Sequence, residues 1–479
     1  MIKNGEGTII VRSKSDVFEL VNSQVGSNRH GWLILLIALG GTFIDAYDFT
    51  SLSIGAVQLK TQFHLTAFQL GSLTAAMAVG ALVAALIGGY YVDKIGRLKM
   101  FMLDLIFFVV SAVFAALAPN LIWLVLFRFL MGVGVGLDFP VALSFVAEFT
   151  NSRRRAMTVN IWQPMWFIAT VLGLLAIIPF YYAGAGLNLW RWAVGLGALP
   201  AVIVLTLRFF YMRESPMWAA SRGQLAEAVK VLRDTYGLNV ELDNHAKITD
   251  EGALSASRAY GNLFSARYKL RTILAVVVNI TESMEYFAVG FYLPTITLLL
   301  FGSHLIYALL GSVVFNLFGI IGGFLNVWRT SKWGIRNLLI IGYCGVIVAL
   351  LAMGILKSLL PPLAASAFIA LFIVSHSFGP GSMGMTIGTL SYPTQFRGAG
   401  SGLSQAAVRA GSILGFYFFP LVLAKVGLPL TLLMLAIVPA AGLITTLAIR
   451  WDPTHKDADR EFAEENIAVN GGVTVPNLK

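Results

Sequence analysis

The composition of this 479-residue chain excludes a soluble protein with an ordinary surface. Hydrophobic residues make up 57% of it, charged residues make up only 12%, and the mean hydropathy is +0.77. Because so little charge cannot cover a surface in water, lipid must be the solvent. The net charge of +10 would suggest nucleic acid as the partner of a soluble protein. In a membrane protein it is assigned to loops on one side of the bilayer, so we expect no nucleic acid partner.

Twelve apolar stretches, each closed by charges, proline or glycine, predict membrane-spanning helices of about twenty residues. The predicted fold class is an all-α membrane protein with twelve transmembrane helices in two six-helix bundles. The predicted spans are 32–58, 67–91, 100–118, 121–148, 157–182, 190–211, 271–300, 304–328, 336–356, 361–390, 398–424 and 428–450.

Most lysines and arginines fall in alternate loops, on the side that also carries both termini. This bias predicts that both termini are cytoplasmic. Within the long central loop, 224–236 has the spacing of an amphipathic helix, and 240–262 has the composition of a disordered linker. The predicted organisation is a cytoplasmic tail (1–31), a bundle (32–211), a cytoplasmic loop (212–269), a second bundle (270–450) and a second tail (451–479).

The chain also contains an internal repeat. Arg155 and Arg397 close matching loops, and each is followed eight residues later by a glutamine, Gln163 or Gln405. The loops after spans two and eight match as well. Two parallel six-helix repeats predict a solute site at the interface between them.

Several motifs resemble those of the major facilitator superfamily of transporters. They are G-Y-Y-V-D-K-I-G-R-L-K at 89–99 and E-F-T-N-S-R-R-R at 148–155. The segments D-A-Y-D (45–48), R-F-L-M-G-V-G-V-G-L-D-F-P (128–140) and Y-P-T-Q-F-R-G (392–398) resemble phosphate:proton symporters. The chain departs from those symporters at Phe139, which replaces a tyrosine, and at Gly381, which replaces an asparagine. E-S-P (214–216) resembles sugar porters, and D-x-Y-D also resembles aromatic-acid:proton symporters.

The predicted proton-coupling residues are carboxylates at membrane depth, where an ionised side chain is costly. Asp45 and Asp48 share a face of span one, and two close carboxylates cannot both ionise cheaply. Alternatively, Asp48 is a solvated residue in the wall of the outer vestibule. Asp138 follows a glycine ladder in span four; alternatively, it forms a structural pair with Arg128 or with another helix.

The predicted coupling residues of span seven are Glu282 and Glu285. They lie near the midplane of the membrane. Alternatively, one of the two glutamates makes an internal hydrogen bond and never changes its protonation state. Asn279 shares their helical face, and Tyr286 and Tyr292 add polar groups; these three are predicted to contact the solute.

Span eleven supplies Arg409, either a counter-ion for an anionic solute or a permanent partner of the span-seven glutamates. Gln163 and Gln405 suit hydroxyls or carboxylates, although bonds between helices explain them as well. Trp166 flanks Gln163 and is also predicted to contact the solute. His376 is interpreted either as a proton shuttle or as a structural group.

Charged residues at the cytoplasmic ends of the spans form a predicted gate. By resemblance to the superfamily, they hold the two halves together on one side and separate during transport. They are Asp93, Arg97, Glu148, Arg155 and Arg397.

These features predict a secondary active transporter in the cell membrane that carries a small polar metabolite with protons by alternating access. An organic or inorganic anion is the favoured solute; a sugar, carried with protons or passively, is the alternative, and a sensor that does not transport is a third possibility. The expected partners are the solute, protons and the lipid bilayer, and we expect a monomer. No metal constellation and no nucleophile–base pair is found, so we expect no metal, no cofactor and no enzyme activity.

Overall fold

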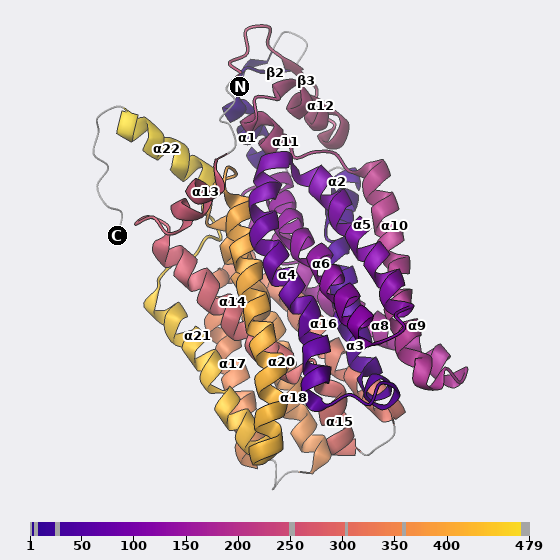
Figure 1. The fold of residues 1–479 in the computed structure, drawn as a ribbon. Coiled ribbons are helices and arrows are strands. Elements are labelled where there is room, and N and C mark those ends of the chain that lie inside the picture. The colour runs from indigo at the N-terminus through magenta and orange to yellow at the C-terminus, as the bar shows by residue number, and fades with distance from the viewer. Residues whose placement is uncertain are drawn as a thin grey trace.

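The fold is seen in a computed structural model that describes residues 2–3, 8–23, 29–248, 254–301, 305–356 and 361–470. Long helices run side by side in one elongated bundle, and the strands gather at one end of it together with several short helices (Figure 1). We call this end, which carries the N-terminal strands, the termini end.

The first half of the bundle begins with two consecutive helices and continues through the predicted spans. The capping box of Thr66 and Gln69 starts one of its helices, and the Asn120 side chain caps another. The helices are α2 (Arg29–Ala38), α3 (Gly40–Gln62), α4 (Ala67–Ile95), α5 (Arg97–Ala116), α6 (Leu121–Phe149), α7 (Arg155–Val159), α8 (Trp162–Tyr182), η1 (Gly186–Asn188), α9 (Leu189–Leu196) and α10 (Ala198–Tyr211).

The second half repeats this arrangement. One of its crossings is broken between Phe378 and Pro380, and Gly427, whose φ is 75°, interrupts α20 between two crossings. The helices are α14 (Lys269–Val289), α15 (Leu293–Phe301), α16 (Leu305–Trp333), α17 (Ile335–Leu356), α18 (Pro362–Phe378), α19 (Pro380–Leu390), α20 (Arg397–Leu435) and α21 (Ile437–Ala448).

The number of crossings agrees with the predicted fold class. Eleven stretches of the described chain are long and apolar enough to span a membrane, and the last of them, Arg397–Ala448, has 52 residues. That length suffices for two crossings, and the chain turns at Gly427 between them. Ile106, Val110 and Phe114 are about half exposed along the outer face of α5, as lipid-facing side chains are.

The two halves meet along two long contacts, α4 against α20 and α8 against α16. The first contact is closest near Gly89: a Cβ atom built there would lie 2.7 Å from the carbonyl oxygen of Gly398 and 2.9 Å from Cα of Gly402. Only glycine allows these two helices to approach so closely at the termini end.

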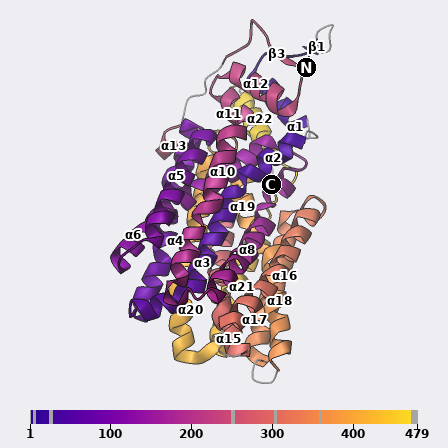
Figure 2. The same ribbon diagram turned by 90° about the vertical axis from the view of Figure 1, so that its right-hand side faces the viewer.

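A small α/β unit with its own core covers the termini end (Figure 2). The first strands of the chain pair with a strand of the central loop, and β2 and β3 are parallel. The predicted helix at 224–236 is confirmed as α12, whereas the predicted linker at 240–262 was partly wrong because it contains β3 and α13. The elements are β1 (Ile2–Lys3), β2 (Ile9–Val11), α1 (Lys14–Ser23), α11 (Pro216–Ser221), α12 (Leu225–Tyr236), β3 (Val240–Leu242), α13 (Ala256–Leu263) and the C-terminal α22 (Ala458–Asn470).

Candidate functional site

A cavity of about 390 Å³ lies between the two halves. Helices α6 and α8 line it from the first half, and α14, α18, α19 and α20 line it from the second. Its lining combines aromatic side chains with a few polar ones, which is the usual lining of a pocket for a small solute. The predicted solute and proton ligands that line it are Gln163, Trp166, Glu282, Tyr286, Gln405 and Arg409.

Aromatic side chains separate this central cavity from a second one farther from the termini end. The indole Nε1 of Trp166 donates to the hydroxyl of Tyr286 at 3.0 Å, which joins α8 to α14 across the two halves. Both residues and Phe287 line the central cavity as well as the second cavity of about 410 Å³. The aromatic group is therefore a thin partition between two chambers.

Arg409 is the cation of the central cavity. With the amide oxygen of Gln405 turned toward it, the guanidinium donates from Nη2 at 2.8 Å and from Nε at 3.2 Å. Its Nη1 has no hydrogen-bond partner among the residues described. The nearest carboxylate oxygen, Oδ2 of Asp45, is 3.9 Å from Nη2. The alternative of a permanent pair with Glu282 or Glu285 was therefore wrong, because neither glutamate reaches this guanidinium.

The two glutamates of α14 instead face the imidazole of His376. Its Nδ1 lies 3.2 Å from Oε1 of Glu285, and its Nε2 lies 3.8 Å from Oε2 of Glu282. The ring stacks on Tyr286 with the centroids 4.7 Å apart. The imidazole is thus within hydrogen-bond distance of Glu285 and lies near Glu282, and both His376 and Glu282 line the cavity.

A buried ion pair joins the first and fourth spans. Nη1 of Arg128 donates to Oδ2 of Asp48 at 2.5 Å, and both side chains are at most 1% exposed. Asp48 is therefore not a solvated wall residue, and Arg128 is not the partner of Asp138.

Asp138 belongs to a second buried cluster. Its Oδ1 accepts from Nη2 of Arg208 at 2.7 Å, and the same guanidinium donates to Asp104 at 3.1 Å. Asp45, Asp104 and Asp138 line a cavity of about 170 Å³ between α3, α5 and α6. Two carboxylates therefore contact one guanidinium inside the first half, and the bond of Asp138 to Arg208 of α10 is the structural pair with another helix that was its alternative.

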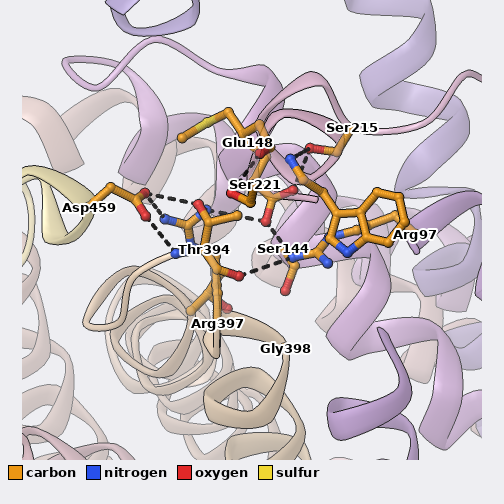
Figure 3. A network of polar contacts seen from close by, with 12 residues as sticks. Arg97, Ser144, Glu148, Ser215, Ser221, Thr394, Arg397, Gly398 and Asp459 are labelled. Carbon is orange, nitrogen blue, oxygen red and sulfur yellow. Dashed lines mark hydrogen bonds and ion pairs between the residues drawn. The ribbon is translucent and has the colours of Figure 1, made fainter. Parts of the chain in front are cut away.

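Charged side chains close the bundle at the termini end (Figure 3). Oε1 of Glu148 accepts from Nη2 of Arg97 at 2.6 Å and from Nη1 of Arg397 at 3.3 Å, so one carboxylate holds an arginine from each half. Its Oε2 accepts from the hydroxyl of Ser215 at 2.5 Å. Arg97 also donates to Asp93 at 3.1 Å.

Backbone amides and the C-terminal segment complete this arrangement. The amides of Gly398 and Ala399, at the start of α20, each donate to Asp93 at 3.1 Å, where a helix N-terminus favours an anion. Asp459 of α22 accepts from Arg397 at 2.7 Å and from the hydroxyl of Thr394 at 3.0 Å. We refer to Asp93, Arg97, Glu148, Arg397 and Asp459 together as the latch.

Glu214 fixes the position of Arg97 in the latch. The chain turns sharply at Gly96, where φ is 104°, and the Glu214 carboxylate accepts from the amides of Arg97 and Leu98 at 2.9 and 3.2 Å. Burial raises the pKa of Glu214, and these amide bonds oppose the shift.

The family of the chain can be decided from its sequence once this geometry is known. Residues 24–449 match the model of the family described as sugar (and other) transporter. The chain belongs to this family. It is a multi-pass membrane transporter of the major facilitator superfamily and not an enzyme.

Relatives of this transporter match most of its length. The inner membrane metabolite transport protein YgcS of Escherichia coli (strain K12) is 28% identical over 90% of this chain and 93% of its own. A D-xylose transporter of Levilactobacillus brevis is 28% identical over 81% of this chain and 86% of its own. The solved structure of the proton:xylose symporter XylE bound to 6-bromo-6-deoxy-D-glucose superposes with a TM-score of 0.78 at 19% identity, covering 91% of this chain and 99% of that one. This structural likeness shows the shared fold.

Some predicted site residues of the transporter lie away from the cavity. Asn279 donates to the carbonyl of Ala275 at 2.7 Å, and the hydroxyl of Tyr292 donates to the carbonyl of Phe416 at 3.2 Å. Neither residue lines the central cavity, and their contact with the solute stays a prediction. Arg155 lies beside the latch and donates to Asn22 of α1 at 2.6 Å.

Sequence reasoning missed Arg208, Asp104 and Asp459 as parts of charged clusters. The first two are close to span ends in the sequence, where charges are ordinary, but they are at most 1% exposed in the folded chain. Charge within an otherwise apolar run was the available signal for Asp104 and Arg208. Asp459 lies in a polar tail and carried no such signal.

Proposed function

We propose that this protein is a proton-coupled symporter for a small hydroxylated metabolite about the size of a sugar. It works as a monomer by alternating access in the cell membrane, with the termini end in the cytoplasm. The solute occupies the central cavity, and the proton occupies a carboxylate that contacts the same arginine as the solute.

The observation that carries this proposal is the contact between Asp45 and Arg409. Asp45 comes from α3 in the first half, Arg409 comes from α20 in the second half, and the closest charged atoms are 3.9 Å apart. Within the described chain, Oδ2 of Asp45 has no hydrogen-bond partner. A proton on Asp45 removes its charge and leaves Arg409 available to the solute, so the two binding events favour each other.

The relatives support a sugar-sized solute more than the anion first favoured from the sequence. Among them are a D-xylose transporter and a proton:xylose symporter. The cavity itself offers amides from Gln163 and Gln405 and flat aromatic faces from Trp162 and Trp166, which suit hydroxyl groups and the apolar faces of a sugar ring.

The latch and the partition give this proposal its two gates. The latch joins the halves at the termini end, so the site cannot open there until Glu148 releases one of its arginines. On the other side, only the partition of Trp166, Tyr286 and Phe287 lies between the central and second cavities. Solute therefore enters through the second cavity and leaves after the latch separates.

Uptake into proteoliposomes tests the proton coupling. For one proton per solute, each pH unit by which the outside is more acidic than the inside is worth about tenfold accumulation of labelled D-xylose or D-glucose. The Asp45→Asn variant is expected to lose this dependence on the pH gradient while it still exchanges internal for external solute. Asp234→Asn, on the exposed face of α12, is the matched control and is expected to accumulate solute normally.

Accumulation that ignores an imposed pH gradient in the unaltered protein contradicts proton coupling. Accumulation by Asp45→Asn that follows the gradient as the unaltered protein does contradicts the assignment of the proton to Asp45.

A further inference from the structure

The buried arginines of the described chain differ in how they are neutralised. Five arginine side chains are at most 1% exposed. Four of them have a carboxylate oxygen within 2.5–2.7 Å. Arg409 is the exception, and it is also the one of the five that lines the central cavity.

The surroundings of Arg409 leave part of its charge without a partner. Gln405, a neutral amide, occupies Nε and Nη2, and Nη1 has no partner within the part of the chain that the structure describes. The rings of Phe49 and Phe139 lie 4.9 and 5.9 Å from the guanidinium carbon, which excludes water from two sides. A buried guanidinium is costly unless it is paired and hydrogen-bonded. The missing partner is an oxyanion.

Other groups without partners in the same cavity describe the rest of the solute. The indole Nε1 of Trp162 is a free donor, and Oε1 of Gln163 is a free acceptor, within the described residues. Hydroxyl groups both donate and accept and so satisfy both. Trp166 and Tyr286 supply aromatic surface for the carbon skeleton between these groups.

We propose that the solute is a sugar acid, a hydroxylated carboxylate of five or six carbons whose carboxylate binds Arg409. This inference rests on the proposed function, because it names the solute class of the same cavity. A bidentate carboxylate matches the guanidinium geometry, and its hydroxyls reach Trp162 and Gln163. A neutral sugar leaves Nη1 with a weaker acceptor, and a cationic solute leaves it with none.

Two negative charges close to Arg409 then explain why the acid travels with a proton. Asp45 and the solute carboxylate compete for one guanidinium, so the loaded site holds both only when Asp45 is protonated. Glu282 also lines the cavity, beside His376.

Binding of matched ligands to the purified protein in detergent tests the inference. The probes are D-glucuronate, D-glucuronamide and D-glucose, which share the ring and differ in the group at carbon six. Calorimetry or a thermal-shift titration is expected to show glucuronate binding roughly 10- to 100-fold tighter than the amide or glucose, as a hydrogen bond to a charged group requires. D-Gluconate, an open-chain acid, tests the ring requirement in parallel and is expected to bind more tightly than glucose.

Variants assign the effect to the arginine. Arg409→Gln is expected to lose the preference for glucuronate over glucuronamide, and Arg409→Lys is expected to keep part of it. Arg258→Gln, on the exposed face of α13, is the matched control and is expected to leave the preference unchanged. Because the preference is measured first in the unaltered protein, a variant that fails to fold does not remove the test.

Equal or tighter binding of glucose than of both acids overturns the inference, and so does the absence of binding by either acid. An unchanged acid preference in a folded Arg409→Gln protein also overturns it. These outcomes are distinct from failure of the proposed function: glucose uptake driven by a pH gradient keeps the symporter and removes the acid, whereas acid binding with uptake indifferent to the gradient keeps the acid and removes the proton coupling.

Discussion

The latch and the central cavity both contain buried charges, but they use them differently. In the latch, Glu148 contacts two arginines and a serine hydroxyl, and Asp93 and Asp459 each accept several hydrogen bonds. At the cavity, Asp45 and Arg409 approach only to 3.9 Å, and each has a polar atom without a partner in the described chain. In the latch every carboxylate has a partner, and the network holds one end of the bundle shut. The charged groups at the cavity are only partly paired.

Depth in the membrane does not explain this difference. Arg128 and Arg208 lie in spans four and six of the first half, yet each has a carboxylate oxygen within 2.7 Å, as the latch arginines do. What distinguishes Arg409 is its place at the interface of the two halves, beside a space large enough for a solute. Completed pairs stabilise one arrangement of the chain, and incomplete ones respond to what binds.

The largest expected effect comes from breaking the latch at its shared carboxylate. Glu148→Ala leaves two buried guanidiniums with one carboxylate partner fewer each, and removing one partner of such a network costs about 3–5 kcal/mol. The closed termini end is expected to lose that stabilisation, which shifts the ratio of open to closed molecules by roughly 100-fold or more. A cysteine in place of the buried Ser144, in a Cys344→Ser background, reports opening through its rate of reaction with a maleimide.

The control for this experiment is Glu241→Ala, which removes an exposed carboxylate from β3. Labelling of the Ser144 position is expected to stay slow in that variant. Equal labelling rates in the Glu148→Ala and unaltered proteins would show that the latch does not hold the end shut.

The sequence predicted the architecture well, for a physical reason. A crossing needs about twenty apolar residues whatever its neighbours are, so the spans could be counted from composition alone. The residues lining the cavity were also largely predictable, because Gln163, Glu282 and Arg409 are polar groups in otherwise apolar helices.

The pairings could not be predicted in the same way. Arg128 lies ten residues before Asp138 on the same helix, about 15 Å along its axis, so that pairing was out of reach. Its actual pairing with Asp48 depends on how α3 and α6 rotate against each other. Asp138 found Arg208 on α10 for the same reason. The parallel pairing of β2 with β3 joins two short segments more than 200 residues apart, and three-residue strands have no periodicity to detect.

A smaller effect tests whether the Asp138–Arg208 pair is as fixed as the latch. A Cβ atom at Gly41 would lie only 1.9 Å from Oδ2 of Asp138, so Gly41→Ala must push the carboxylate away from Arg208. Such overpacking costs about 1–3 kcal/mol, which is expected to lower the midpoint of thermal unfolding followed by tryptophan fluorescence. Gly261→Ala is the control, because nothing lies within 4 Å of its Cβ position. An unchanged midpoint in Gly41→Ala would mean that Asp138 moves freely, as a coupling group does.

The smallest expected effect concerns the edge of the latch and its dependence on pH. Burial alone would raise the pKa of Asp459, but the Arg397 guanidinium and the Thr394 amide outweigh it and hold the pKa below the usual value of about 3.9. A carboxyl group whose pKa is depressed by folding stabilises the fold above its unfolded pKa, and this contribution disappears as the pH falls through the lower, folded value.

Asp459→Asn is therefore expected to lower stability by about 1–2 kcal/mol near pH 7 and to make no difference once the pH is well below about 3.9. Thermal unfolding of both proteins between neutral and acidic pH measures this convergence. A stability difference between the two proteins that stays constant across this pH range would show that Asp459 holds Arg397 by shape rather than by charge. The ionic part of the latch would then not include Asp459.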